Sequence, residues 1–230
     1  MTTRSDGLRT IVPFDPDDPC TRLAPVLDPP ERREFAAAMR DDVLDAVRAG
    51  GGEPELLSPE PIDADVPVTV DERSLSKAVN GVLAAAAERL LTGGRPCPND
   101  TGQPVAVVMA DLALATPRAL AALFDADGDV VIAPGRGAGT NALVVRDPEF
   151  RVDYHGASYL DHRRAARNVE ADVRTIDSYQ LATDIDEPAD LSELLVHGDG
   201  RAARWLRDAG FEVTVGEGRT AVERADDVRV

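Results

Sequence analysis

Residues 130–146 read VVIAPGRGAGTNALVVR, a glycine-rich segment between two apolar runs. The runs 130–133 and 142–145 have the composition of short buried strands. The segment therefore predicts a strand, a tight turn and a second strand. The rest of the chain can be interpreted outward from it.

The turn itself carries groups that suit an anionic ligand. Gly137 and Gly139 admit positive φ and let a ligand approach the backbone, because no Cβ intervenes. Arg136 offers a cation suited to phosphate or carboxylate. Thr140 and Asn141 add a hydroxyl and an amide at the mouth of the turn. An ordinary turn between strands is the alternative, since the spacing is not GxGxxG, no helix follows, and the chain has no GxxxxGK[ST] loop.

Strand-like apolar runs alternate with amphipathic helical segments along the chain. The runs 105–109 (VAVVM) and 130–133 (VVIA) lack in–out alternation, which is typical of a sheet covered on both faces. This alternation predicts an α/β fold with a mostly parallel, twisted sheet flanked by helices. We expect one domain over residues 1–215, followed by a polar, mobile C-terminal tail over 216–230. Further strands are expected at 8–14, 55–57, 66–70, 171–176 and 211–215, and helices at 31–49, 74–91, 117–124, 159–169, 189–196 and 200–209.

Charge is the clearest global property of the sequence. The chain of 230 residues has 42 acidic residues against 25 basic ones, a net charge of −17, and Lys77 is the single lysine. This composition is typical of proteins of extreme halophiles, in which high salt screens self-repulsion. It argues against a broad nucleic-acid surface, which needs a basic stripe, but not against one nucleotide in one cleft.

Targeting and cysteine signals are weak. The chain has no apolar run long enough to span a membrane, and its N-terminus has no apolar signal core, so we expect a cytoplasmic protein. Cys20 and Cys97 stand far apart and outside any CxxC pattern. We expect two free thiols and no disulfide or cysteine-rich metal site.

Polar groups follow several of the predicted strands, where ligands bind in open α/β sheets. Arg22 follows the first strand, Asp111 follows the run 105–109, and Asp184 and Asp186 precede a helix. Two such carboxylates over one glycine-rich turn would suit Mg²⁺, which takes oxygen ligands from one or two carboxylates plus phosphate. The alternatives are a surface acid before a helix for Asp111 and a helix cap for Asp186.

Two histidines and a basic helix remain open to interpretation. His155 and His162 lack metal-binding spacing, so structural roles are expected, with His155 the better candidate for touching a substrate. Arg163, Arg164 and Arg167 lie on one predicted helix and are either solvated surface charges or a local attraction for anions.

Five sequence blocks span about residues 9–196: IVPFDPDDPCTRLAPVLDPPERREFAAAM, VMADLALATP, PGRGAGTNAL, YHGASYLDH and TDIDEPADL. Together they resemble the 2-phospho-L-lactate guanylyltransferase family of coenzyme F-420 biosynthesis, which has a nucleotide-diphospho-sugar transferase fold. The AD-L block, the glycine-rich block and the D-I-D-x-P-x-D-L block occur in the family's order.

The resemblance implies transfer of a guanylyl group from GTP to 2-phospho-L-lactate, with phosphoenolpyruvate or 3-phosphoglycerate as alternative acceptors and with release of pyrophosphate. It assigns Mg²⁺ to Asp111 and Asp186, contact with the phosphorylated acid to Thr140 and Ser158, and the triphosphate to Arg22. It also implies a homodimer and a downstream transferase that attaches the deazaflavin. Further candidates for substrate binding are Arg136, Gly137, Gly139, His155 and Gly156.

The chain departs from the family pattern at three places. Asp15 stands where lysines are common, which leaves Arg22 as the main cation of that loop. Where the family has F-G-x-x-S, this chain has YHGAS ending at Ser158, so Gly156 is one place late and His155 takes the glycine's position. The segment from Ser74 lacks the family's G-L-N helix start, so guanine contacts are not assigned to it.

Two other functions fit the same pattern. One is a nucleotidyltransferase acting on molybdopterin or a sugar phosphate, which shares the fold and the aspartate arrangement. The other is a non-catalytic nucleotide-binding module that binds GTP without turnover.

Overall fold

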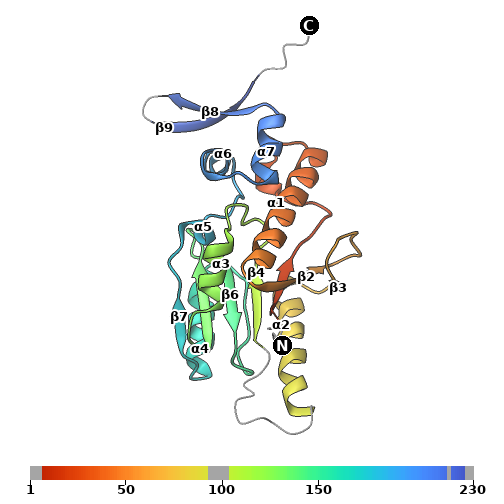
Figure 1. Ribbon diagram of the computed structural model, residues 1–230, viewed down its shortest axis with the longest axis vertical. Coiled ribbons are helices and arrows are strands. Elements are labelled where there is room, and N and C mark those ends of the chain that lie inside the picture. The colour runs from red at the N-terminus through yellow and green to blue at the C-terminus, as the bar shows by residue number, and fades with distance from the viewer. Residues whose placement is uncertain (1–6, 93–103, 217–218, 226–230) are drawn as a thin grey trace, which may run out of the picture.

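The computed structural model describes residues 7–92, 104–216 and 219–225 (Figure 1). Cys97 and the first six residues of the N-terminal segment, in which no targeting signal is expected, lie outside these ranges. Among the described residues, none of the helices combines the length and apolar character that crossing a membrane requires.

One seven-stranded sheet forms the centre of the protein. Four of its six neighbouring pairs are parallel, and β6 runs antiparallel to both of its neighbours. The expected mostly parallel α/β sheet is confirmed. Its strands, in spatial order, are β3 (Val68–Val70), β2 (Gly52–Ser58), β1 (Leu8–Pro13), β4 (Val105–Val108), β6 (Thr140–Val145), β5 (Val130–Pro134) and β7 (Val173–Thr175).

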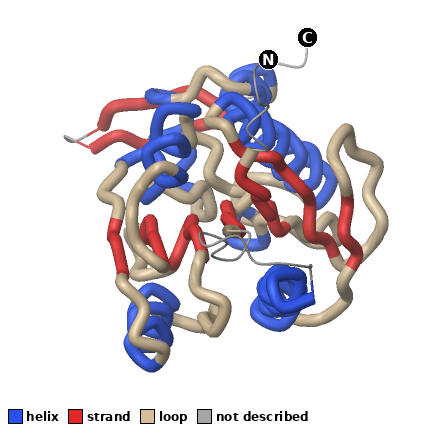
Figure 2. The backbone as a smooth tube through the Cα atoms, turned by 60° about the horizontal axis from the view of Figure 1, so that its bottom comes forward, coloured by secondary structure: helices blue, strands red, loops and turns tan. Residues whose placement is uncertain are grey.

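Helices cover both faces of the sheet, as Figure 2 shows. Alternate side chains of each central strand point to opposite cores: in β4, Val107 packs on one side and Val108 on the other. Both faces are buried at the centre of the sheet, which explains why β4 and β5 are apolar throughout. One face carries α1 (Pro29–Ala49), α3 (Pro117–Phe124) and the short α5 (Tyr179–Ala182), and the other carries α2 (Leu75–Thr92) and α4 (Ser158–Asn168).

The long helix α1 begins at a capping box. The Asp28 side chain accepts from the Glu31 backbone N–H at 2.9 Å, and the Glu31 carboxylate accepts from the Asp28 N–H at 2.9 Å. Each hydrogen bond satisfies an N–H group that the first helical turn leaves free. Gly50 caps the other end, and Gly51 reverses the chain with φ of +93°. The helix expected at 31–49 is confirmed, with its start two residues earlier at Pro29.

A C-terminal layer packs on α1 at the end of the sheet where the short 3-10 helix η1 (Thr21–Leu23) lies. It forms a third core around Phe35, whose ring lies 5.4 Å from that of Trp205. Its elements are η2 (Pro188–Asp190), α6 (Leu191–His197), α7 (Arg201–Asp208), β8 (Phe211–Gly216) and β9 (Arg219–Arg224).

The hairpin of β8 and β9 corrects the expectation of a tail from residue 216. Residues 219–224 form a strand that pairs antiparallel with β8, from Gly216↔Arg219 to Phe211↔Arg224. The sequence RTAVER has little apolar signal because the strand places Val222 alone against the third core. Residues 217–218 and 226–230 lie outside the described part of the chain.

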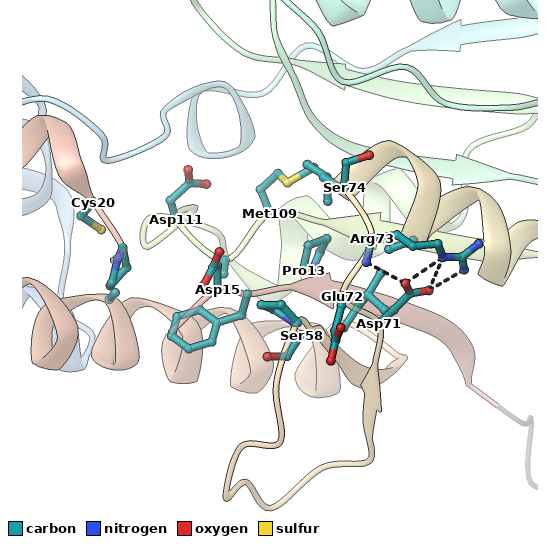
Figure 3. A pocket seen from close by; sticks show the side chains of 18 of the residues that line it. Pro13, Asp15, Cys20, Ser58, Asp71, Glu72, Arg73, Ser74, Met109 and Asp111 are labelled. Atoms are coloured by element: carbon teal, nitrogen blue, oxygen red, sulfur yellow. Dashed lines mark hydrogen bonds and ion pairs between the residues drawn. The ribbon is translucent and has the colours of Figure 1, made fainter. Parts of the chain in front are cut away.

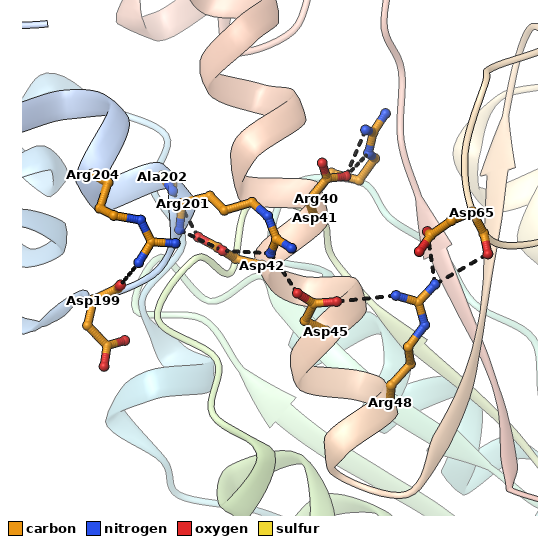
Figure 4. A network of polar contacts seen from close by, with 10 residues as sticks. All are labelled: Arg40, Asp41, Asp42, Asp45, Arg48, Asp65, Asp199, Arg201, Ala202 and Arg204. Carbon is orange, nitrogen blue, oxygen red and sulfur yellow. Dashed lines mark hydrogen bonds and ion pairs between the residues drawn. The ribbon is translucent and has the colours of Figure 1, made fainter. Parts of the chain in front are cut away.

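Asp42 of α1 caps the neighbouring helix α7 (Figure 4). Its two carboxylate oxygens accept from the backbone N–H groups of Arg201 and Ala202 at 2.8 and 2.9 Å. Arg201 also pairs with Asp45 at 2.6 Å, and Asp45 pairs in turn with Arg48. Because the carboxylate is 11% exposed, this contact is better protected from salt than a surface ion pair.

Replacing Asp42 by alanine is expected to lower the free energy of unfolding by about 2 kcal/mol, since it removes a helix cap and charge-assisted hydrogen bonds. The loss should persist in molar KCl. Urea unfolding of both proteins measures it. Asp41→Ala is the matched control, because Asp41 is 39% exposed and pairs with its neighbour Arg40. Equal stabilities of the two variants would contradict the capping role.

Candidate active site

Asp111 and the segment 184–186 meet beyond the carboxyl end of β4. The Ile185 backbone N–H donates to the Asp111 carbonyl oxygen at 3.1 Å, which fixes the two segments against each other. Asp111 is half-buried, and its buried Oδ1 has no hydrogen-bond partner within the described residues. Burial, together with the negative charges of Asp184 and Asp186, raises the pKa of the Asp111 carboxyl to about 7.

Asp186 stands at the same place but faces a cation. Its Oδ2 lies 2.7 Å from Nη1 of Arg22, and Arg22 also lies 3.6 Å from Oε1 of Glu187. Burial raises the pKa of Asp186, and Arg22 opposes that shift. The structure thus brings together Asp111, Asp186 and Arg22, which the sequence placed at three separate strand or segment ends.

Asp184 joins this cluster through Asn141. The Asn141 Nδ2 donates to the Leu181 carbonyl oxygen at 3.0 Å and to Asp184 Oδ1 at 3.3 Å. Asn141 reaches these groups because β6 has an irregular register there: Ala133 pairs with Ala142 and Pro134 with Thr140, so Asn141 is passed over. Such a bulge re-aims side chains beside a site, and no pattern in the sequence marks it.

The glycine-rich turn has a different conformation from the one expected. Its positive φ of 63° falls on Ala138, and neither Gly137 nor Gly139 takes a left-handed conformation. Gly135 is needed for packing, since a Cβ there would lie 2.5 Å from Asn141 Oδ1. A Cβ at Gly137 would meet nothing within 4 Å, so that residue borders open space where a ligand can approach the backbone.

Arg136 forms an ion pair with another residue of the chain. Its Nη2 lies 2.6 Å from Asp190 Oδ1, and its backbone N–H donates to the Ala182 carbonyl oxygen. Asp190 also accepts from the backbone N–H groups of Asp186 and Glu187. Arg136 therefore joins the turn to the acidic segment, which differs from the free anion-binding cation that the sequence suggested.

Thr140 and Ser158 lie in contact and are both buried. The Thr140 backbone N–H donates to Ser158 Oγ at 2.9 Å, and Thr140 Oγ1 lies 2.8 Å from His162 Nδ1. The Tyr159 N–H donates to the Ala138 carbonyl oxygen at 3.1 Å. The start of α4 is thus fastened directly to the glycine-rich turn.

His155 and Gly156 lie outside this buried contact. The His155 ring is 78% exposed and its Nδ1 lies 2.5 Å from Asp153 Oδ1. Gly156 takes φ of +51° in open space. That His155 is the better candidate for touching a substrate stays a prediction, and His162 is the histidine that is hydrogen-bonded to Thr140.

A cavity of about 470 Å³ extends from Asp111 to the start of α2 (Figure 3). Asp15 and Cys20 line it near Asp111, and burial raises the pKa of the Cys20 thiol to about 12. At the far end of the cavity the Arg73 guanidinium pairs with the Asp71 carboxylate, with Nε 2.8 Å from Oδ1. Sequence analysis missed Ser58, Asp71 and Ser74 as lining residues, since no motif marked them.

The residues present fit a divalent cation that brings part of its own ligand set. Within the described residues, no group of three or more His, Cys, Asp or Glu side chains is arranged to hold a metal ion. The partnerless, buried oxygen of Asp111 next to Asp186 is nevertheless the kind of hard donor that Mg²⁺ takes, with phosphate oxygens completing its shell.

Comparison with known proteins identifies the family. Residues 8–225 match the family described as Guanylyl transferase CofC like. The chain belongs to this family. A 2-phospho-L-lactate guanylyltransferase of Halomicrobium mukohataei is 59% identical over 94% of this chain and 100% of its own length. One of Haloferax volcanii is 56% identical over 94% of this chain and 98% of its own length.

Solved structures of low sequence identity share the fold of this CofC-like chain. A putative nucleotide-diphospho-sugar transferase of Desulfovibrio desulfuricans superposes with a TM-score of 0.64 at 15% identity, over 86% of this chain and 93% of that one. A nucleotidyl transferase of Methanothermobacter gives 0.58 at 14% identity, over 89% and 100%. The fold expected from the resemblance is confirmed.

In this CofC-like chain, Asn80 of α2 holds the loop that leads to Ser158. Its Nδ2 donates to the Val152 carbonyl oxygen at 2.9 Å, and its Oδ1 accepts from the Val152 N–H at 2.8 Å. The Tyr154 N–H donates to Ser76 Oγ at 2.8 Å. Helix α2 therefore lines the cavity with its own N-terminal end and also fixes the loop before α4.

Replacing Asn80 by aspartate is expected to lower the free energy of unfolding by about 1–3 kcal/mol, because a carboxylate cannot donate to the Val152 carbonyl oxygen. Thermal unfolding measures the loss. Asn168→Asp makes the same chemical change at an exposed position on α4. If Asn80→Asp and Asn168→Asp unfold at the same temperature, the two hydrogen bonds between Asn80 and Val152 contribute nothing to stability.

Proposed function

We propose that this chain transfers a guanylyl group from GTP to 2-phospho-L-lactate and releases pyrophosphate. The observation that carries the proposal is the convergence of Asp111 and Asp186 beside the glycine-rich turn. A cavity large enough for a nucleoside opens at Asp111, and the paired Thr140 and Ser158 lie at the turn. The names of the halophilic relatives support the choice of substrates.

The reaction is an in-line displacement at phosphorus. A phosphate oxygen of the acid attacks the α-phosphorus of GTP, the bond from that phosphorus to the bridging oxygen of the β-phosphate breaks, and pyrophosphate leaves with the electron pair. No covalent intermediate with the protein forms. Such chemistry depends on positioning the reactants and on offsetting their charge.

The residues divide this work between them. Asp111 and Asp186 would hold Mg²⁺, which would offset the charge of the two anionic reactants. Arg22 adds the cation nearest to these carboxylates. Thr140 and Ser158 would hold the phosphorylated acid. Mg²⁺ is the proposed ion because the donors are carboxylate oxygens.

The divalent ion and Arg22 are more important for binding a triphosphate in this chain than they would be in a chain with a basic cavity. Asp15, Asp71, Glu72 and Asp111 all line the cavity, whereas Arg73 is the cation in its described lining. A triphosphate entering an acidic cavity needs its charge offset by the metal, by Arg22 and by the salt of the medium.

One assay tests the function. Pyrophosphate release is measured in molar KCl with four nucleoside triphosphates crossed against 2-phospho-L-lactate, phosphoenolpyruvate and 3-phosphoglycerate. We expect release with GTP and 2-phospho-L-lactate, abolished by chelation of the divalent ion. Turnover with a sugar phosphate or molybdopterin alone, or GTP binding without turnover, would refute the proposal. The product is an acid anhydride of two phosphates, so we propose a transferase that attaches the deazaflavin as its consumer.

A further inference from the structure

The proton on His162 can be located from its two hydrogen bonds. The Asp153 backbone N–H donates to His162 Nε2 at 2.9 Å, so Nε2 presents its lone pair. The ring proton of neutral imidazole is then on Nδ1. Nδ1 lies 2.8 Å from Thr140 Oγ1, so the imidazole donates to the threonine hydroxyl.

The surroundings of His162 keep the ring neutral. The side chain is 0% exposed, and its ring meets those of Tyr154 and Phe150 edge-on at 5.0 and 6.1 Å between centroids. Burial lowers the pKa of His162 to about 4, against the opposing charges of Asp153 and Asp161. An imidazolium would also present a proton to the Asp153 N–H.

These hydrogen bonds determine which hydrogen-bonding roles remain for the hydroxyl groups of Thr140 and Ser158. Thr140 Oγ1 accepts from His162, and Ser158 Oγ accepts from the Thr140 backbone N–H. Each hydroxyl therefore keeps its own proton to donate. Two adjacent O–H donors beside the glycine-rich turn match an anionic oxygen, which offers lone pairs only.

We propose that His162 is a positioning residue for the acceptor substrate: it donates to Thr140 and so directs the threonine hydroxyl proton toward the phosphorylated acid. The inference rests on the proposed function, since Thr140 acts on that substrate. His162 itself touches neither substrate. Its effect passes through one hydroxyl group.

Two substitutions separate the two hydrogen bonds of His162. His162→Asn places an amide near Nδ1 and retains a donor to Thr140, whereas His162→Gln places one near Nε2 and retains the partner of Asp153. We expect His162→Gln to raise KM for the acid roughly 10- to 100-fold, the size of a lost hydrogen bond to a charged group. KM for GTP should change little, and His162→Asn should recover part of the loss.

A double-mutant cycle with Thr140→Val tests whether the effect passes through the hydroxyl. Once that hydroxyl is absent, His162→Gln should change KM for the acid no further. Thr140→Ser, which keeps a hydroxyl, should stay sensitive to His162→Gln. Additive effects of the two substitutions, or equal rises in KM for both substrates, would reduce His162 to a packing residue and overturn the inference.

The tautomer is measured without turnover. Side-chain ¹⁵N spectra of the three histidines should show one ring protonated on Nδ1 and neutral down to about pH 4, and His162→Gln should remove that signal. A proton on Nε2 overturns the inference. An inactive wild-type enzyme would refute the proposed function alone, because the spectra still decide whether His162 donates to Thr140.

Discussion

Asp111→Asn should lower the rate of pyrophosphate release by about 10²-fold or more, because a bound divalent ion supplies several kcal/mol of charge stabilisation and about 1.4 kcal/mol corresponds to tenfold in rate. The amide keeps the shape of the side chain but loses the charge that attracts the ion. The measurement is kcat for pyrophosphate release at saturating GTP and acid.

The same substitution should stabilise the metal-free protein in a pH-dependent way. The pKa of Asp111 rises from 3.8 to about 7 on folding, so between these values the folded state binds the proton that the unfolded state has lost. Stability contributed by this group is present below about pH 4 and is lost as pH rises toward 7. The amide of the variant does not titrate and has no such loss, so the Tm difference should be small at pH 4 and largest at pH 8.

A matched control is Asp127→Asn, which makes the same charge change at an exposed position in the loop after α3. It should leave kcat unchanged. If Asp111→Asn retains wild-type turnover, or melts below the wild type at pH 8 with chelator present, the assigned role of Asp111 fails.

Arg22→Gln is expected to lower kcat/KM for GTP by about 10²-fold, the size found when one donor aimed at developing charge is removed. In the structure Arg22 pairs with Asp186 at 2.7 Å and is 64% exposed, so it is free to turn to a triphosphate once an ion neutralises Asp186. Because the charged side chains that line the cavity are mostly acidic, other side chains there cannot readily supply the positive charge of Arg22.

Arg22→Lys keeps the charge but loses the planar fork, so it should fall between the wild type and Arg22→Gln. Arg118→Gln on the exposed start of α3 is the control for charge alone. Initial rates at varied GTP in molar KCl measure all four proteins. Equal kcat/KM values for Arg22→Gln and Arg118→Gln would show that Arg22 does not contribute to the use of GTP. Its role would then be limited to the ion pair with Asp186 in the metal-free protein.

Much of the fold was predictable because its signals are local. Apolar runs such as 105–109 give strands buried on both faces, and the helix expected at 31–49 corresponds to α1. Three elements were missed for physical reasons. The 3-10 helix η1 spans only three residues. The helix α5 is a single turn, and the strand β9 is mostly polar because only its pairing with β8 makes it a strand.

The site was predictable where topology alone positions a residue. Asp111 follows a central strand, so its place at the carboxyl edge was expected, and Asp186 joins it through the contact of Ile185 with Asp111. The linkage of Asn141 to Asp184 depends on a bulge, and the tautomer of His162 depends on Asp153 across the α4 loop. Such contacts between distant segments leave no periodic pattern in a sequence.

The central claim is that Asp111 and Asp186 together hold one divalent ion on the triphosphate. Titration of Mn²⁺ by electron paramagnetic resonance, with a non-hydrolysable GTP analogue present, tests it directly in the wild type, Asp111→Asn and Asp186→Asn. We predict that each substitution weakens Mn²⁺ binding about tenfold or more, comparable to the loss of groups that support a metal site. Wild-type Mn²⁺ affinity in either variant would contradict the claim.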